Sequence, residues 1–88
     1  MTPGMNTKII MYSGDHCSDC TRSKRLLDSL GVEYQVIEVD GNPQALEKVM
    51  EINEGFRAIP VILFEDGTHL TEPSDKALKT KLKTLSII

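Results

Sequence analysis

The chain lacks tryptophan and has only four aromatic side chains, two phenylalanines and two tyrosines, among its 88 residues. It also lacks any basic run, because 13 acidic residues outnumber 10 basic ones and give a net charge of −3. Proteins that bind nucleic acids concentrate positive charge on one surface to attract phosphates. We therefore predict no nucleic-acid partner.

Long hydrophobic runs are absent as well. No stretch approaches the roughly 18 apolar residues that cross a bilayer, and residues 1–7 lack the apolar segment of a signal peptide. We therefore expect a cytoplasmic protein without membrane association.

Hydrophobic residues make up 40% and charged residues 26% of the chain, which is typical of a globular protein. This length has room for one domain with a modest core, so we predict a monomer with a single domain over residues 1–88, in which residues 1–7 form a loose end.

Cysteine is scarce too, with only Cys17 and Cys20 in the chain. Small secreted domains usually need several disulfides, and the loop that this pair would close is too short to stabilise a fold much. One close pair in a cytoplasmic protein is typical of redox or metal chemistry. The spacing alone leaves open a redox dithiol, half of a zinc site and two spare thiols. Zinc is the weaker interpretation, because the pair and the adjacent His16 supply three ligands at most.

Apolar periodicity and turn residues predict elements in the order βαβαββα. Strands are expected over 8–12, 32–40, 60–64 and 68–71, and helices over 18–30, 43–53 and from a Ser74 cap to Leu85. Gly31 is expected to end the first helix, and Asn42 with Pro43 to begin the second. The turn at Asp66-Gly67 predicts an antiparallel hairpin.

Each helix has an apolar stripe that is expected to face the core. The predicted inward residues are Ser23, Leu26, Leu27, Leu30, Ala45, Leu46, Val49, Met50, Ala77, Leu78, Leu82 and Leu85. The lysines at 76, 79, 81 and 83 are expected in water, and His69 on the surface. Tyr12 is expected to pack, and Phe56 and Phe64 are predicted to be core or loop anchors.

A βαβ unit with a right-handed crossover, joined by a helix to a hairpin, gives a four-stranded mixed sheet with helices on both faces. This α/β layout is that of the thioredoxin-like fold. It places Cys17 at the start of the first helix, where unpaired N–H groups and the helix dipole favour a thiolate. We therefore predict that Cys17 attacks and that Cys20, one turn on, resolves.

The sequence resembles the glutaredoxin family across roughly residues 8–85. The resemblance rests on Cys17-Ser18-Asp19-Cys20 after the first strand and on Ala58-Ile59-Pro60 before the third. Residues 53–61 and 64–74 look most like the mycoredoxins, bacterial glutaredoxins that serve thiols other than glutathione.

This resemblance implies a thiol–disulfide oxidoreductase that reduces mixed disulfides or protein disulfides. It implies no tightly bound cofactor and no metal. The electron donor would be a low-molecular-weight thiol (mycothiol, bacillithiol or glutathione), with a thioredoxin-type reductase as a further possibility. The partners would be this thiol and disulfide-bearing proteins. The alternative within the family is an iron–sulfur or zinc carrier.

The resemblance also implies substrate-binding residues. Pro60 matches the family's cis-proline, which faces the cysteine pair and leaves the Ile59 backbone free to pair with an extended substrate. Arg57 is either a partner for a substrate carboxylate or a solvated loop charge. Three further residues, Thr71, Ser74 and Asp75, lie where the family binds the γ-glutamyl-like end of a thiol, and plain helix capping by Ser74 is the alternative.

Two departures from the family pattern bear on the donor. Ser18-Asp19 stands where glutathione-using members carry Pro-Tyr, and residues 71–75 replace a Gly-Gly turn before the last helix. Glutathione is therefore not favoured as the natural thiol. The NrdH-type redoxins, which draw on thioredoxin reductase, carry a tryptophan-containing segment that this chain lacks, so that donor is not indicated either.

Overall fold

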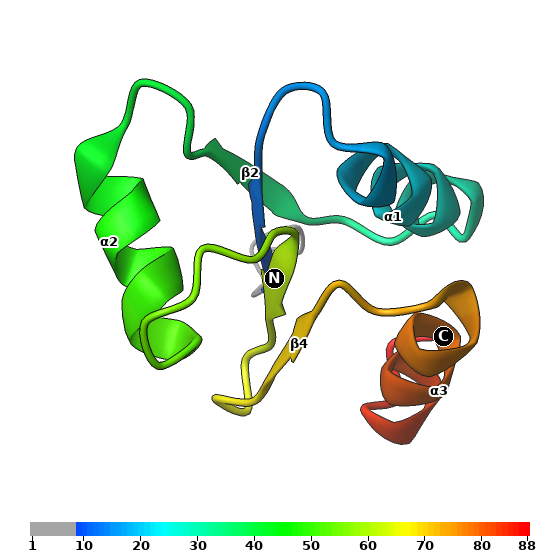
Figure 1. The fold of residues 1–88 in the computed structure, drawn as a ribbon. Helices are drawn as coiled ribbons and strands as arrows, with labels where there is room; N and C mark the ends of the chain where they lie inside the picture. Colours follow the sequence, from blue (N-terminus) through cyan, green and yellow to red (C-terminus); the bar gives the residue numbers. More distant parts are fainter. Residues whose placement is uncertain (1–8) are drawn as a thin grey trace, which may run out of the picture.

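The computed structural model describes residues 9–88, so the predictions for residues 1–7 and for Lys8 lie outside the described part. The elements follow the predicted order (Figure 1). They are β1 (Ile10–Ser13), α1 (Ser18–Ser29), β2 (Gln35–Glu38), α2 (Pro43–Ile52), β3 (Val61–Leu63), β4 (His69–Thr71) and α3 (Asp75–Thr84).

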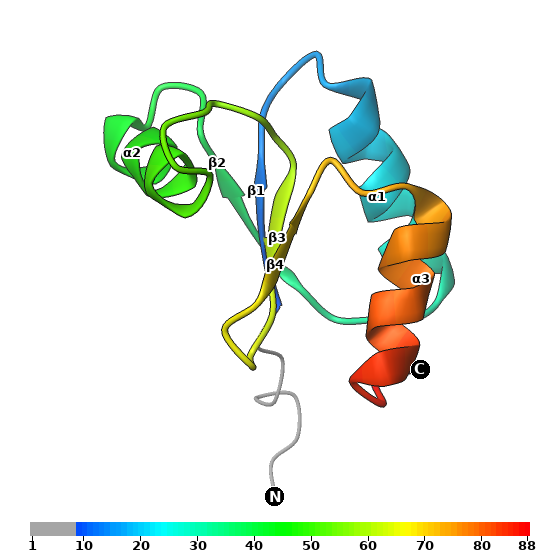
Figure 2. The same cartoon turned by 60° about the horizontal axis from the view of Figure 1, so that its bottom comes forward.

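The strands form a four-stranded sheet in the order β2-β1-β3-β4. β1 runs parallel to β2 and antiparallel to β3, which is antiparallel to β4. Figure 2 shows α2 on one face of the sheet and α1 with α3 on the other. The predicted thioredoxin-like arrangement, a mixed sheet with helices on both faces, is therefore confirmed.

Side chains of β1 alternate between the two faces of the sheet, as a strand requires. Met11 packs with Leu27, Leu78 and Leu82 in the layer beneath α1 and α3, and all four are fully buried. Tyr12 packs in the opposite layer with residues of α2, which confirms that it is a packing residue. Because both faces of β1 are covered, the strand that leads to Cys17 is held firmly.

The helix ends were predicted from local residues. Gly31 has a φ of 70°, and the Val32 N–H donates to the Leu27 carbonyl across this turn (3.0 Å). Asn42 and Ser74 each accept a hydrogen bond from a backbone N–H inside the helix that they cap. All three predicted helix boundaries are confirmed to within a residue or two.

Several side-chain predictions were wrong. Ala77 is exposed, because the buried face of α3 is centred on Leu78 and Leu82. Lys81, expected in water, is half-buried, with its Nζ 5.6 Å from the centre of the Phe64 ring and 3.5 Å from Asp66. Its aliphatic stem covers apolar surface while its charge reaches a carboxylate.

Phe56 was predicted to be a core or loop anchor, and this prediction was also wrong. The side chain is 72% exposed on the loop between α2 and β3, whereas Phe64 is buried and Met50 is half-buried. β2 is shorter than predicted, because it pairs only with the four residues of β1. Among residues 9–88, no helix is long and apolar enough to span a membrane.

The turn from β4 to α3 includes a residue in a conformation that favours glycine. Glu72 has a φ of 49°, in the left-handed region that is sterically unfavourable for side chains with a Cβ. Its side chain is exposed and makes no ion pair within residues 9–88.

We predict that Glu72→Gly raises the free energy of unfolding by about 0.5–1 kcal/mol, measured by urea denaturation. Glu72→Ala keeps the Cβ and is expected to leave the free energy of unfolding without this increase. An equal increase in both variants would show that the positive φ of residue 72 is not its cause.

Tyr34 connects the segment before β2 to the end of α1. Its hydroxyl donates to Asp28 Oδ1 (2.8 Å). Burial first, and then the hydrogen bond and charge of Asp28, raise the pKa of Tyr34 to about 12. An unfolded chain releases the same proton near pH 10. The contribution of Tyr34 to stability is therefore complete below pH ~10 and is lost as the pH rises from there towards 12.

Tyrosinate absorbance can test this directly, because Tyr12→Phe leaves Tyr34 as the only tyrosine. We expect a titration midpoint near 12 in the folded Tyr12→Phe protein, because burial and, after it, the hydrogen bond and charge of Asp28 oppose ionisation. Adding Asp28→Asn removes that charge and is expected to lower the midpoint towards 10. Identical midpoints with and without Asp28 would contradict the account.

Candidate redox site

Cys17 is the N-cap residue of α1. Its backbone is extended (φ −118°, ψ 103°), and its Sγ accepts a hydrogen bond from the Cys20 N–H (3.1 Å). Serine, threonine, aspartate and asparagine usually fill this position, because a side-chain acceptor satisfies an otherwise unpaired helix N–H. The sulfur therefore lies at the positive end of the α1 dipole, which stabilises negative charge.

The two cysteines form a disulfide, and their Cα atoms are 5.2 Å apart, a separation typical of such bonds. Their exposures differ. Cys17 is half-buried, whereas Cys20 is 1% exposed and packs in the core beneath α1. Of the two residues, Cys17 is therefore the one that an incoming reagent can reach more readily.

The loop before Cys17 depends on a glycine for its close packing. A Cβ on Gly14 would lie 2.8 Å from Ile59 Cδ1 and 3.3 Å from Asp40 Oδ2. The absence of a side chain thus lets Ile59 approach the redox loop. The sequence around Gly14 carries no local signal of this contact, because Ile59 lies far along the chain.

Ile59 and Pro60 lie beside the disulfide. The peptide bond between them is cis, as the resemblance implied, and the Ile59 carbonyl oxygen lies 3.9 Å from Cys17 Sγ. Within residues 9–88, neither the N–H nor the C=O of Ile59 pairs with another backbone group. Pro60 is buried, and its carbonyl accepts a hydrogen bond from the Glu72 N–H (2.9 Å).

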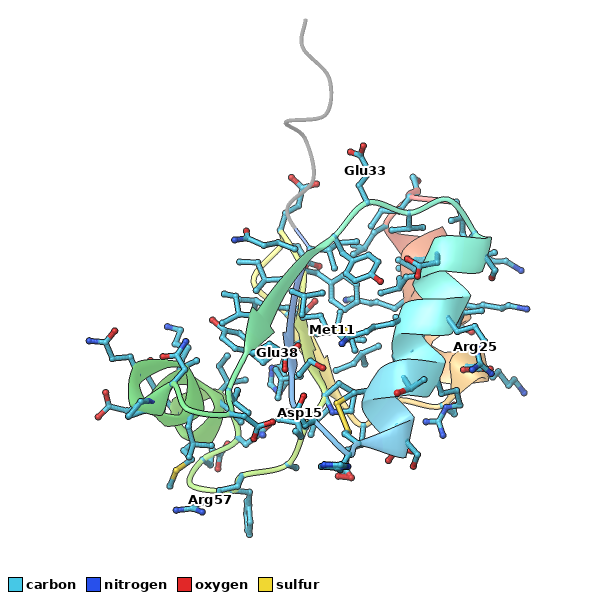
Figure 3. All side chains as sticks on the ribbon, turned by 90° about the horizontal axis from the view of Figure 1, so that it is seen from above. Met11, Asp15, Arg25, Glu33, Glu38 and Arg57 are labelled. Atoms are coloured by element: carbon cyan, nitrogen blue, oxygen red, sulfur yellow. A yellow bond between two sulfur atoms is a disulfide. The ribbon has the colours of Figure 1, made fainter. Side chains whose placement is uncertain are left out.

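Arg57 lies on the loop after α2, where Figure 3 shows its side chain pointing away from the body of the protein. It is exposed and forms no ion pair with any residue from 9 to 88. The structure therefore leaves a charged group available near the segment that leads to Ile59.

The remaining predicted substrate-binding residues all have partners inside the protein. The Thr71 hydroxyl donates to Asn53 Oδ1 (2.7 Å). Ser74 Oγ accepts a hydrogen bond from the Ala77 N–H (3.1 Å), so it caps α3. The Asp75 carboxylate lies 3.5 Å from Arg22 Nε. Ser74 and Asp75 therefore lie together at the N-terminus of α3, with their side chains engaged.

Arg22 connects the redox helix to this segment. Its guanidinium pairs with Asp19 (2.9 Å) and Asp75 (3.5 Å) and donates to the Pro73 carbonyl (3.0 Å). The contact with Asp19, three residues earlier on α1, could have been expected from helix geometry. The contacts with residues 73 and 75 could not, since they depend on how α3 packs beside α1.

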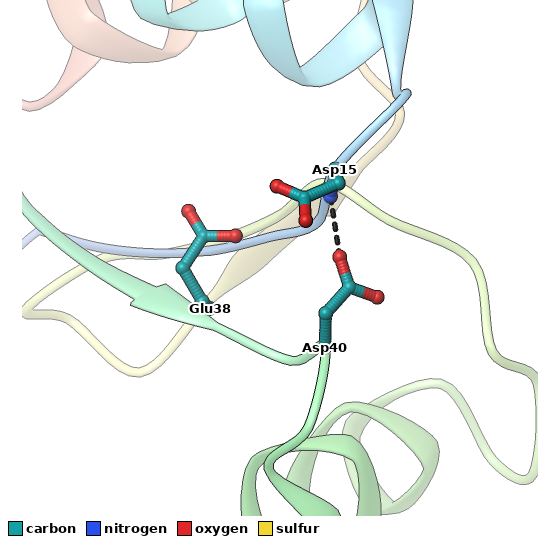
Figure 4. Close-up of side chains that lie close together, drawn as sticks. All are labelled: Asp15, Glu38 and Asp40. Carbon is teal, nitrogen blue, oxygen red and sulfur yellow. Dashed lines mark hydrogen bonds between the residues drawn. The ribbon is translucent and has the colours of Figure 1, made fainter.

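An acidic cluster lies beside the loop that leads to Cys17 (Figure 4). Carboxylate oxygens of Asp15, Glu38 and Asp40 lie within 4.8 Å of one another, and all three residues are exposed. Asp40 Oδ2 accepts a hydrogen bond from the Asp15 N–H, and Lys24 pairs with Glu38 (3.7 Å). In Figure 3 Asp15 is close to the yellow sulfur–sulfur bond, so this cluster adds negative charge near the site.

Comparison with known proteins agrees with this geometry. The sequence profile of the family described as glutaredoxin matches residues 9–70. Mycoredoxin 1 of Corynebacterium glutamicum is 34% identical over 80 residues, which cover 91% of this chain and 99% of the relative. A putative glutaredoxin of Mycobacterium tuberculosis is 34% identical over 74 residues, covering 84% of this chain and 88% of that protein.

Solved structures agree as well. The crystal structure of a glutaredoxin from Archaeoglobus fulgidus superposes with a TM-score of 0.73 at 28% identity, over 85% of both chains. The family match extends from the start of β1 into β4 and includes both cysteines and Pro60. With this match, and with Cys17 and Cys20 joined at the start of α1, the chain belongs to the glutaredoxin family and is a thiol–disulfide oxidoreductase.

Proposed function

We propose that this protein reduces mixed disulfides between proteins and a low-molecular-weight thiol, and also protein disulfides, with Cys17 as the attacking thiolate and Cys20 as the resolving thiol. The observation that carries this assignment is the difference between the two sulfurs. Cys17 is only half-buried and its Sγ accepts a helix N–H, whereas Cys20 is buried one turn further along.

The chemistry proceeds by two exchanges. The Cys17 thiolate attacks one sulfur of the substrate disulfide, forms a mixed disulfide with it and releases the other sulfur as a thiolate. Cys20 then loses its proton and attacks the Cys17 sulfur, which expels the second substrate thiolate. Two electrons pass from the dithiol to the substrate, and the protein is left with the Cys17–Cys20 disulfide. Two molecules of a low-molecular-weight thiol then reduce that disulfide by two further exchanges, and they leave joined as their own disulfide.

The open backbone of Ile59, beside the cis-proline Pro60, is proposed to pair with the main chain of the substrate. Its N–H and C=O lack backbone partners among residues 9–88, and its carbonyl lies 3.9 Å from Cys17 Sγ. Arg57 is proposed to meet a substrate carboxylate. The polar end of a thiol is proposed to contact residues 71–75 through the first-turn N–H groups of α3, because the side chains of Thr71, Ser74 and Asp75 are already engaged.

We further propose that the natural donor is mycothiol or bacillithiol rather than glutathione. Ser18-Asp19 within the redox motif and the lack of a Gly-Gly turn in residues 71–75 depart from the pattern of glutathione users. A thioredoxin-type reductase is the competing donor. The proposed working form is a single-domain cytoplasmic monomer without a tightly bound cofactor, which acts on disulfide-bearing proteins and not on nucleic acids or membranes.

Replacing Cys17 and replacing Cys20 are predicted to affect disulfide reduction differently. Cys17→Ser is expected to abolish reduction of both mixed and protein disulfides, by about 10³-fold or more, because it removes the nucleophile. Cys20→Ser is expected to lose protein-disulfide reduction but to retain turnover of thiol–protein mixed disulfides, because the small thiol can release Cys17 instead. Coupled assays with both substrates measure this. Ser29→Ala, at an exposed position at the far end of α1, is the control; an active Cys17→Ser and an inactive Cys20→Ser would reverse the assignment.

The role of Arg57 is predicted to depend on the thiol. Arg57→Gln is expected to raise KM about two- to fivefold for mixed disulfides of glutathione and bacillithiol, which carry carboxylates, because exposed ion pairs contribute up to about 1 kcal/mol. Mixed disulfides of mycothiol, which has no carboxylate, are expected to be unaffected. Arg25 is an exposed arginine on α1, so Arg25→Gln is the control. A loss that is equal for all three thiols would contradict a carboxylate contact.

A further inference from the structure

The side chain of Asn53 connects parts of the chain that the sheet does not join. Asn53 follows α2 as its C-cap residue. Its Nδ2 donates to the carbonyls of Ala58 (3.0 Å) and Phe56 (3.4 Å), and its Oδ1 accepts a hydrogen bond from the Thr71 hydroxyl (2.7 Å). One amide group thus joins the end of α2, the loop before Pro60 and the edge strand β4.

The loop over residues 56–59 has few other attachments. Its only backbone hydrogen bond within residues 9–88 runs from the Phe56 N–H to the Asn53 carbonyl (3.4 Å). Glu54 and Gly55, which precede it, both have positive φ (56° and 104°). At its far end the Ile59 side chain contacts Gly14. The Asn53 amide is therefore the main polar attachment of the loop.

The first two residues of the loop lie outside the core, whereas Ile59 at its end packs against both hydrophobic layers. Phe56 is 72% exposed, and Arg57 is exposed as well. The hydrogen bonds of Asn53 to Ala58 and Thr71 are partly buried, where removing one partner leaves the other unsatisfied. Partly buried hydrogen bonds therefore fix the shape of a loop whose first half is exposed and whose last residue, Ile59, lies beside Cys17.

We propose that Asn53 and Thr71 are positioning residues for the reaction: their hydrogen bonds fix the loop over residues 56–59 so that the open Ile59 backbone lies correctly beside Cys17. The Thr71 hydroxyl then acts within the protein, through Asn53, and not on the thiol. This inference rests on the proposed binding of substrate at Ile59. Its consequence is a raised KM, because an Ile59 backbone that is out of place loses its hydrogen bonds to the substrate.

Four variants separate the hydrogen-bonding groups. Asn53→Ala removes both the donors and the acceptor. Asn53→Asp keeps the acceptor for Thr71 but places a carboxylate against the Ala58 carbonyl. Thr71→Val removes the hydroxyl at nearly constant shape, and Thr71→Ser restores it. Asn42→Ala is the matched control, since it removes the side-chain cap at the other end of α2 without touching the loop.

The experiment measures kcat and KM for a peptide–thiol mixed disulfide below the melting temperature of every variant. In the Cys20→Ser background it also measures the rate at which iodoacetamide alkylates Cys17. We expect Asn53→Ala, Asn53→Asp and Thr71→Val to raise KM about tenfold, and Thr71→Ser and Asn42→Ala to change it less than twofold. The double variant Asn53→Ala/Thr71→Val is expected to be no worse than Asn53→Ala. Alkylation is expected to stay within twofold of the parent, because the sulfur itself is untouched.

Unchanged KM in Asn53→Ala and Thr71→Val, with only a lower melting temperature, would reduce both residues to a structural role and overturn the inference. A loss in Thr71→Ser equal to that in Thr71→Val would show that the hydroxyl is not the acting group. Failure of the parent protein to reduce the mixed disulfide at all would instead overturn the proposed function, and the inference with it.

Discussion

The hydrogen bond from the Cys20 N–H to Cys17 Sγ is the interaction on which the site depends. It begins α1, as any N-cap bond does, and the same N–H group stabilises negative charge on the sulfur. It also underlies the roles that we propose for the two cysteines. The residue that caps the helix is accessible, whereas the residue that donates the bond lies inside the first turn, with its own sulfur in the core. In the proposed mechanism, a single structural bond thus distinguishes the nucleophile from the resolving thiol.

The surrounding structure holds this helix start in place from three sides. β1, buried on both faces, brings the chain to the loop before Cys17. Arg22 ties the first turns of α1 to the segment before α3 and neutralises Asp19, a carboxylate within the redox motif. Asn53 holds the loop that brings the Ile59 carbonyl to the sulfur. Hydrogen bonds and ion pairs therefore hold the segments on both sides of the disulfide. The disulfide itself packs on the hydrophobic core through Cys20.

Features that depend on neighbouring residues were predictable from the sequence. The caps at Asn42 and Ser74, the stop at Gly31 and the order of elements follow from local spacing, and so does the position of Cys17 on α1. Features that depend on distant packing were not. The exposure of Phe56, the contact between Gly14 and Ile59, and the bonds of Asn53 and Arg22 to residues 71–75 join segments that only the folded chain brings together. The family resemblance located Ile59 and residues 71–75, but not the partners that engage their side chains.

The central claim is that the start of α1 makes Cys17 the thiolate of the pair. Alkylation of the fully reduced protein by iodoacetamide over a range of pH, with each cysteine followed by peptide mass spectrometry, tests it most directly. The account predicts that Cys17 is modified first, with a midpoint clearly below the pH of about 8.5 at which an ordinary cysteine ionises, and that Cys20 remains largely unmodified. Equal modification of both cysteines, or a midpoint at or above that of an ordinary cysteine, would contradict it.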